Sequence, residues 1–229
     1  MKVLIGLNST FVDQMTQTWM HREFENGVRD FFIPAGGTPE GLYSLWRKEK
    51  PDWIDKTFLF QVDDIVDGPQ KNKFYDFFQK HLGDYRQRLQ RIGETKAPTK
   101  FSTILGLGLN GHVAFHEPNL DENFSFGEVE LTEITKKYLG LREDSVKGIT
   151  YGVGTFLKSE SILLMVKGTH KADILNRFLR DDPSCPAIAL KKNANLTLVV
   201  DEELWKLVDE DLKKNSIKKV RDSHINFFV

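Results

Sequence analysis

The chain has 229 residues, of which 40% are hydrophobic and 28% are charged. This mixture is typical of a folded globular protein and excludes the intrinsically disordered, collagen-like and low-complexity classes. The 32 basic and 33 acidic residues leave a formal net charge of -1, so no overall positive field favours nucleic acid or an anionic membrane as a partner. The length fits a single domain that spans 1–229.

The cysteine content and the hydropathy predict the cellular compartment. Cys185 is the one cysteine of the sequence, so an intramolecular disulfide is excluded. The apolar run at the N-terminus is too short for a signal peptide, and no stretch approaches the ~18 uninterrupted apolar residues of a membrane-spanning helix. We therefore expect a cytoplasmic protein without a membrane partner.

Short apolar runs alternate with stretches of helical apolar spacing along the chain. The runs predict strands at 3–7, 30–34, 57–62, 103–106, 161–167 and 196–200. The helical spacing predicts one helix that begins after a cap at Ser9 or Thr10 and a second that begins after a cap at Thr38. It predicts four further helices, over 74–92, near Thr155, over 171–179 and over 202–212. This alternation predicts an α/β fold with a doubly wound, mostly parallel sheet and helices on both faces.

The turn after the second predicted strand has the features of an anion site. Gly36 and Gly37 precede Thr38 at a predicted helix start, where unencumbered N–H groups meet the positive end of the helix dipole. Lys171, at the start of a later helix, is a candidate for the matching cation. A plain turn with a threonine cap and a solvated lysine is the alternative interpretation.

The third predicted strand ends on two adjacent carboxylates, Asp63 and Asp64. Burying such a pair costs free energy unless the groups are solvated or used. A carboxylate at a strand end that faces a ligand crevice is a candidate general base.

The glycines that follow the fourth predicted strand match the dinucleotide-binding pattern Gly106-x-Gly108-x-x-Gly111. That motif requires a long helix that opens at its third glycine. Pro118 lies seven residues after Gly111 and would interrupt such a helix, so the context argues against a nicotinamide or flavin cofactor.

The same segment carries four candidate polar side chains. His112, His116 and Glu117 suggest a zinc site, but histidines four residues apart share a face only on a continuous helix. Alternatively, His112 is an acid or base whose ring is oriented by Asn110 and Glu117. Each of them could also serve only as a hydrogen-bonding loop residue.

Taken together, these motifs resemble one family, the glucosamine-6-phosphate deaminases and the related 6-phosphogluconolactonases. The resemblance rests on the segments 34–39 (PAGGTP), 62–64 (VDD), 105–118 (LGLGLNGHVAFHEP), 149–155 (ITYGVGT) and 167–172 (KGTHKA), in the order of the family. The ending Ala114-Phe115-His116-Glu117-Pro118 is similar to the deaminase form, whereas lactonases lack the glutamate and proline. The resemblance therefore favours a deaminase.

The resemblance implies a role for each matching residue. Asp63 matches the carboxylate that moves the substrate proton, His112 matches the ring-opening base, and Asn110 and Glu117 match its partners. The matches to the phosphate contacts are Gly36, Gly37, Thr38 and Lys171. The implied reaction converts glucosamine 6-phosphate to fructose 6-phosphate and ammonia, without a metal or an organic cofactor.

Four positions depart from the family pattern. Asn110 stands where many members carry Asp, and His116 replaces the usual Asn. Asp64-Ile65 replaces the usual Glu-Tyr, so we expect Asp64 and His116 to alter the fit of the substrate in its pocket. Arg142 is the nearest counterpart of the arginine that grips the phosphate in the family.

Two other functions remain open on the sequence alone. The first is hydrolysis of 6-phosphogluconolactone, with His112 activating water and without dependence on Glu117. The second is a non-catalytic sensor of a sugar phosphate. In either case the expected partner is a small phosphorylated sugar, and the apolar end Phe227-Phe228-Val229 makes a homo-oligomer possible.

Overall fold

A computed structural model of the chain describes residues 1–214. Its centre is a sheet of seven parallel strands in the order β1-β10-β9-β6-β2-β3-β5. The strands are β1 (Lys2–Gly6), β2 (Asp30–Ile33), β3 (Phe58–Gln61), β5 (Leu89–Gln90), β6 (Phe101–Gly106), β9 (Ile162–Val166) and β10 (Leu196–Asp201). Six of them are the predicted strands, with ends that agree within two residues, so the predicted α/β fold class is confirmed.

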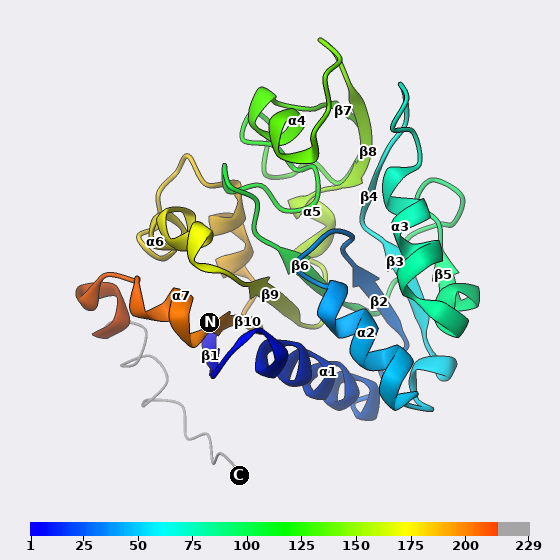
Figure 1. The fold of residues 1–229 in the computed structure, drawn as a ribbon, viewed down its shortest axis with the longest axis horizontal. Helices are drawn as coiled ribbons and strands as arrows, with labels where there is room; N and C mark the ends of the chain where they lie inside the picture. Colours follow the sequence, from blue (N-terminus) through cyan, green and yellow to red (C-terminus); the bar gives the residue numbers. More distant parts are fainter. Residues whose placement is uncertain (215–229) are drawn as a thin grey trace.

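Helices cover both faces of this sheet (Figure 1). One face packs on α1 (Ser9–Glu25), α2 (Glu40–Glu49) and α3 (Lys73–His81); the other packs on α5 (Val153–Phe156), α6 (Ala172–Leu179) and α7 (Glu202–Lys206). The strands supply both cores because their side chains alternate. In β2, Phe31 and Ile33 join the first core, and Phe32 joins the second.

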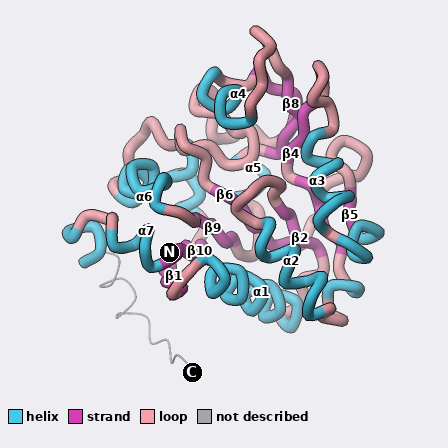
Figure 2. Tube along the Cα trace, viewed as in Figure 1, coloured by secondary structure: helices cyan, strands magenta, loops and turns pink. Residues whose placement is uncertain are grey.

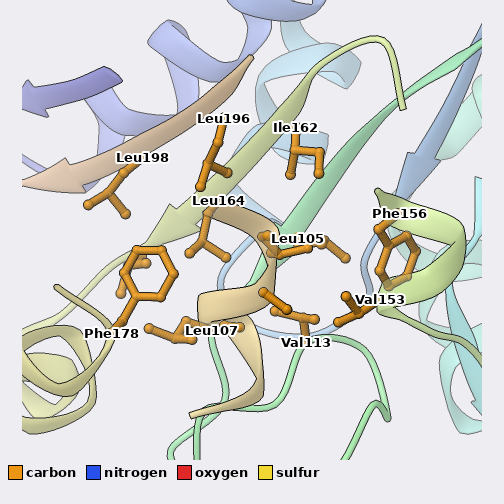
Figure 3. Close-up of a cluster of buried hydrophobic side chains, with 14 of the residues drawn as sticks. Leu105, Leu107, Val113, Val153, Phe156, Ile162, Leu164, Phe178, Leu196 and Leu198 are labelled. Carbon is orange, nitrogen blue, oxygen red and sulfur yellow. The ribbon is translucent and has the colours of Figure 1, made fainter. Parts of the chain in front are cut away.

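The second core is almost wholly aliphatic and aromatic (Figure 3). Leu105 of β6, Leu164 of β9 and Leu198 of β10 meet Phe156 of α5 and Phe178 of α6 within it. Because these strands are buried on both faces, they appear in the sequence as nearly continuous apolar runs.

A smaller antiparallel sheet lies at one end of the molecule, with α4 (Glu133–Leu139) beside it (Figures 1 and 2). Its strands are β4 (Asp63–Ile65), β8 (Lys147–Tyr151) and β7 (Phe126–Glu130), in the order β4-β8-β7. The apolar cluster beneath it includes Ile65, Phe115 and Leu131. The sequence analysis did not predict this layer, whose strands have only three to five residues each.

The predicted helix over 74–92 is wrong in its second half. α3 ends at His81, and Gly83 has a φ of 59°, a left-handed conformation that terminates an α-helix. Residues Gly83–Arg88 form 3-10 turns, and β5 then joins the edge of the main sheet. The apolar spacing continued past His81 because Leu82 and Tyr85 pack into the same core.

Three helix ends also differ from the predictions. Asn8 caps α1 by accepting from the N–H groups of Thr10 and Phe11, in place of the predicted Ser9 or Thr10 cap. Thr38 caps no helix, because α2 begins at Glu40 without a side-chain cap. α7 ends at Lys206. The apolar segment 227–229 lies outside the described residues, and within 1–214 no helix is long and apolar enough to cross a membrane.

Candidate active site

A pocket lies beyond the carboxyl ends of β2 and β6, between the main sheet and the layer that contains α4. Its walls are formed by residues 34–39, 106–108, 112, 114 and 115, by 135, 138 and 139 of α4, and by Asp63, Phe74 and Lys171. The carboxyl ends of parallel strands are where such sheets bind ligands. Another depression, lined by Lys2, Arg22 and Glu160 among others, lies at the amino ends of the strands and holds none of the predicted site residues.

The loop at Gly36 and Gly37 forms one wall of this pocket. Gly36 has a φ of 99°, and a Cβ atom added to either glycine would meet no atom within 4 Å. The backbone N–H groups of Gly36 and Gly37 donate to no described residue, so they can bind an oxyanion just before the start of α2. The side chain of Thr38 lies beside Gly106 on the same wall.

Lys171 supplies a cation at the pocket wall. Its side chain is buried, and Nζ donates to the carbonyl of Leu107 at 2.8 Å. Burial lowers the pKa of the Lys171 ammonium to about 8. The ring of Tyr138 on α4 lies 5.2 Å from Nζ. Burial disfavours the protonated, charged form of Lys171, and an anion held between this side chain and the Gly36–Gly37 loop would stabilise it.

Asp63 is buried at the pocket wall, 6% exposed. Burial, and next the negative charge of Asp64, raise the pKa of the Asp63 carboxyl well above its usual range. Among residues 1–214, no group donates a hydrogen bond to this carboxyl. A carboxyl in such surroundings takes up a proton readily, which suits a group that accepts and returns protons.

Asp64 lies outside the pocket, contrary to the prediction that it belongs to the substrate site. Its carboxylate accepts from the N–H groups of Ile65, Phe74 and Tyr75 at 2.8, 2.9 and 3.1 Å, and from Nε2 of Gln61 at 2.9 Å. Two of those N–H groups belong to the first turn of α3. Asp64 therefore fixes the start of a helix.

His112, Asn110 and Glu117 are brought together, as the sequence analysis expected. Asn110 Nδ2 donates to Glu117 Oε2 at 2.8 Å, and Asn110 Oδ1 accepts from the backbone N–H of His112 at 3.2 Å. Nδ1 of His112 lies 3.7 Å from Glu117 Oε2. The His112 ring lies against Gly108, where an added Cβ would come within 2.3 Å of Nε2.

Glu117 is fully buried and ionised. Burial alone would raise the pKa of its carboxyl, but the hydrogen bonds and charge of His112, and the hydrogen bonds of Thr135 and Asn110, outweigh burial and lower the pKa to about 2. A fixed carboxylate beside an imidazole orients the ring and stabilises the imidazolium. The same pocket is thus lined by the imidazole of His112 and the carboxyl of Asp63.

A sequence model of the glucosamine-6-phosphate isomerases/6-phosphogluconolactonase family matches residues 65–199. The chain belongs to this family. The predicted family resemblance is therefore confirmed.

Curated relatives of this family member carry the name glucosamine-6-phosphate deaminase. One from Exiguobacterium sibiricum is 29% identical over 224 residues, which cover 85% of this chain and 86% of the relative. One from Bacillus cereus is 30% identical over 204 residues, which cover 78% of each chain.

Solved structures of both branches of the family share the fold. A monomeric glucosamine-6-phosphate deaminase has a TM-score of 0.73 at 23% identity, with 90% of this chain and 100% of that chain covered. The 6-phosphogluconolactonase of Trypanosoma brucei has a TM-score of 0.73 at 13% identity, with 91% and 98% covered. The fold is thus common to the two activities and does not distinguish them.

Two residues assigned from the family pattern lie away from the pocket. His116 is buried, and its Nδ1 accepts from the backbone N–H of Val153 at 3.2 Å. Burial lowers the pKa of the His116 imidazole to about 4. Arg142 is exposed and lines a different surface depression, together with Glu133 and Lys136. Neither side chain is placed to contact a ligand in the pocket.

The alternative sites considered for the 106–118 segment are not formed. Nδ1 of His116 accepts from the N–H of Val153, and within the described part of the chain no three His, Cys, Asp or Glu side chains converge as metal ligands. Gly111 is followed by turns instead of a helix, so the dinucleotide motif lacks its helix.

Two threonines that the sequence analysis missed complete the hydrogen-bond cluster. Thr132 is the N-cap of α4, and its hydroxyl donates to Glu117 Oε2 at 3.0 Å. The hydroxyl of Thr135 lies 3.2 Å from Nδ1 of His112. The capping preference of threonine before the apolar residues Ile134 and Tyr138 is the signal that could have revealed α4.

Proposed function

We propose that this family member is a glucosamine-6-phosphate deaminase, which converts glucosamine 6-phosphate and water to fructose 6-phosphate and ammonia. The observation that carries the proposal is the pairing, in one pocket, of an oriented imidazole at His112 with a carboxyl of raised pKa at Asp63. An aldose-to-ketose conversion needs one group to open the sugar ring and another to move a proton between adjacent carbons. The names of the curated relatives support the same activity.

The phosphate of the substrate binds at the Gly36–Gly37 loop in this proposal. The open N–H groups at the start of α2 and the ammonium of Lys171 both suit a dianion. The hydroxyl of Thr38 makes no hydrogen bond to a described residue and can donate to the same phosphate. Binding energy at this remote end holds the reacting carbons in position.

His112 opens the pyranose ring. The imidazole takes the proton of the C1 hydroxyl and gives a proton to the ring oxygen as the C1–O5 bond breaks, which leaves an aldehyde at C1. Glu117 stabilises the imidazolium formed between the two transfers, because its carboxylate is ionised and held by Asn110.

Asp63 carries out the proton transfer between carbons. Its carboxylate removes the proton from C2, which the aldehyde has acidified, while the aldehyde oxygen gains a proton given up by the substrate ammonium group, and an enolamine forms. Returning that proton to C1 gives an imine at C2. Water adds to the imine carbon and ammonia leaves, so that the ketose phosphate remains. The raised pKa of Asp63 fits this shuttle because it lowers the cost of holding the proton between the two steps.

A coupled assay tests the proposal. Purified protein is given glucosamine 6-phosphate, and ammonia and fructose 6-phosphate are followed together. We expect both products in equal amounts, and a loss of ~10²–10⁴-fold in kcat for Asp63→Asn and for His112→Gln. The matched controls are Asp76→Asn and His21→Gln, which replace exposed side chains of the same types on α3 and α1 and should leave kcat unchanged.

Hydrolysis of 6-phosphogluconolactone is the outcome that would replace the proposal. The family includes this activity, and its solved structures share the fold. Protein that releases no ammonia but hydrolyses the lactone, with Glu117→Gln retaining the lactone activity, would overturn the deaminase assignment. Protein that binds the sugar phosphate and turns over neither substrate would indicate a sensor.

A further inference from the structure

A nearly buried ion pair joins α1 to the end of β9. Asp13 belongs to the buried face of α1, and its Oδ1 accepts from Nζ of Lys167 at 2.8 Å. Lys167 is the first residue after β9, and its side chain is 11% exposed. Neither side chain lines the pocket. Any effect of this pair on a ligand there must therefore pass through other residues.

The second carboxylate oxygen of Asp13 lies against the first turn of α2. A Cβ atom added to Gly41 would come within 2.1 Å of Oδ2 and 2.9 Å of Cγ of Asp13. The φ of Gly41 is not positive, so the close approach of the carboxylate, and not the backbone conformation, is what excludes a larger side chain at this position. One carboxylate thus contacts both α2 and the residue that follows β9.

The first turn of α2 is closed onto the Gly36–Gly37 loop by Tyr43. The hydroxyl of Tyr43 donates to the carbonyl of Pro34 at 2.6 Å, and its backbone N–H donates to the carbonyl of Pro39 at 3.1 Å. These two carbonyls flank the loop on either side. A displacement of this turn of α2 is therefore transmitted to the loop.

Lys167 begins the turn that carries Lys171. Gly168 comes next, with a φ of 89°, and its N–H donates to Oδ2 of Asp201 at 2.7 Å. The carbonyl of Gly168 accepts from the N–H of Lys171 at 3.0 Å, and Nζ of Lys171 donates to the carbonyl of Leu107. The turn is short and hydrogen-bonded within itself, so a displacement of Lys167 is transmitted to Lys171.

The burial of the Asp13 and Lys167 pair is unfavourable for the carboxylate. Burial raises the pKa of the Asp13 carboxyl, and the hydrogen bond and charge of Lys167 offset that rise only in part. A buried ion pair is therefore weak evidence for added stability, and in some proteins such a pair specifies geometry instead. The contacts of Asp13 indicate which geometry this is, namely the placement of α2 relative to the turn after β9.

We propose that Asp13 is a positioning residue that sets the separation between the Gly36–Gly37 loop and Lys171, and thereby the affinity of the pocket for a phosphate group. Asp13 acts through Gly41 on one side and through Lys167 on the other. The proposal rests on the proposed function in one respect, which is that a phosphate binds between this loop and this ammonium.

Calorimetric titration of the full-length protein with inorganic phosphate tests the proposal. We expect the Kd of phosphate to rise by about 10-fold in Asp13→Ala and in Lys167→Met, because misplaced groups bind the anion less well. The matched control is Asp209→Ala, which breaks an exposed ion pair with Arg180. That control should leave the Kd within about 2-fold of the native value.

Gly41→Ala perturbs the same contact without removing a polar group. Its methyl group would displace the Asp13 carboxylate, while alanine is a better helix former than glycine. We expect this variant to raise the Kd of phosphate by about 10-fold in the native background and by less than about 2-fold in Asp13→Ala, where no carboxylate meets the methyl group. A general loss of stability would not produce this dependence of one substitution on the other.

The kinetic arm uses the same variants with glucosamine 6-phosphate. We expect KM to rise by about 10-fold in Asp13→Ala and in Gly41→Ala, with kcat within about 3-fold of the native value, because binding of the phosphate is weakened and the proton-transfer groups are unchanged.

The outcomes separate the possible failures. An unchanged Kd of phosphate in Gly41→Ala, or in both Asp13→Ala and Lys167→Met, would overturn the role of Asp13. Additive effects of Gly41→Ala and Asp13→Ala would overturn it as well. Native protein whose phosphate affinity depends on Asp13 as expected, but which turns over no amino-sugar phosphate, would support that role and instead contradict the deaminase assignment.

Discussion

At the scale of single residues, the imidazole of His112 depends on the absence of a side chain at Gly108. A Cβ atom at position 108 would lie 2.3 to 2.5 Å from three ring atoms of His112. We predict that Gly108→Ala folds but displaces the ring, so that kcat falls by at least about 10-fold. Gly37→Ala makes a useful contrast, because its added Cβ meets nothing within 4 Å. That variant should alter KM through the phosphate loop and leave kcat nearly intact. Equal kcat values for the native protein and Gly108→Ala would contradict this geometry.

The sequence could identify residues of the site but not the direction of each side chain. Asp63, His112 and Glu117 follow strand ends or lie in the loop after a strand, and the convergence of strand ends in a parallel sheet predicts that such residues meet. Asp63 and Asp64 are adjacent in β4, so their side chains point to opposite faces. Which of the two faces the pocket depends on the pairing of β4 with β8, a contact between distant segments.

At the scale of elements, Asp64 determines where α3 begins. The helix has no side-chain cap of its own, because Asn72 is in a left-handed conformation and makes no capping hydrogen bond. The Asp64 carboxylate, eight residues upstream of Asn72, accepts from two N–H groups of the first turn instead. We predict that Asp64→Ala lowers the free energy of unfolding by about 1–3 kcal/mol, because buried donors lose their partner. Urea unfolding measures the change.

The matched control for this helix is Asp76→Ala. Asp76 lies in the first turn of α3 and is exposed, so its loss should change the free energy of unfolding by less than about 0.5 kcal/mol. Equal effects of the two substitutions would show that Asp64 does not hold the helix start.

The elements that the sequence analysis missed are those that tertiary contacts define. α4 has seven residues and β4 has three, and elements of this length carry little periodic signal. Their stability comes from packing on Phe115 and Leu131, which the chain brings together from separate segments. Because α4 was not predicted, the expected site did not include Thr132 and Thr135, which this helix positions.

At the scale of the whole molecule, the architecture was the most predictable property. Continuous apolar runs such as those at 162–166 and 196–200 indicate strands buried on both faces, and helical segments between them require parallel crossovers. That pattern does not give the exact order of the strands. It predicts a pocket at their carboxyl ends but not which residues line it. The layer of β4, β7 and β8 with α4, from which Asp63 and three residues of α4 line the pocket, had to be observed.

The dependence of global stability on pH contains a contribution from His116. The unfolded imidazole has a pKa near 6.5, and burial lowers the pKa of the folded one to about 4. Between those values the unfolded state binds a proton that the folded state does not bind, so stability rises with pH across this window and falls on acidification.

Glu117 acts in the same direction at lower pH, between 4.5 and about 2, because its folded pKa is lowered. Asp63 acts in the opposite direction, since its raised pKa stabilises the fold below 3.8 and that stabilisation is lost as pH rises through the folded value.

Substituting His116 isolates its share of this dependence. An asparagine at position 116 has an oxygen that can accept from the N–H of Val153 but no group that titrates. We predict that His116→Asn removes about 2–4 kcal/mol of the stability change between pH 6.5 and pH 4, from a shift worth roughly 1.4 kcal/mol per pKa unit. Urea unfolding of both proteins at several pH values gives this difference, whatever the absolute stability of the variant. His21→Asn, which replaces an exposed histidine of α1, should retain the native slope. A native slope in His116→Asn as well would mean that the buried imidazole is protonated in the folded protein, and that its contact with the N–H of Val153 is not made in solution.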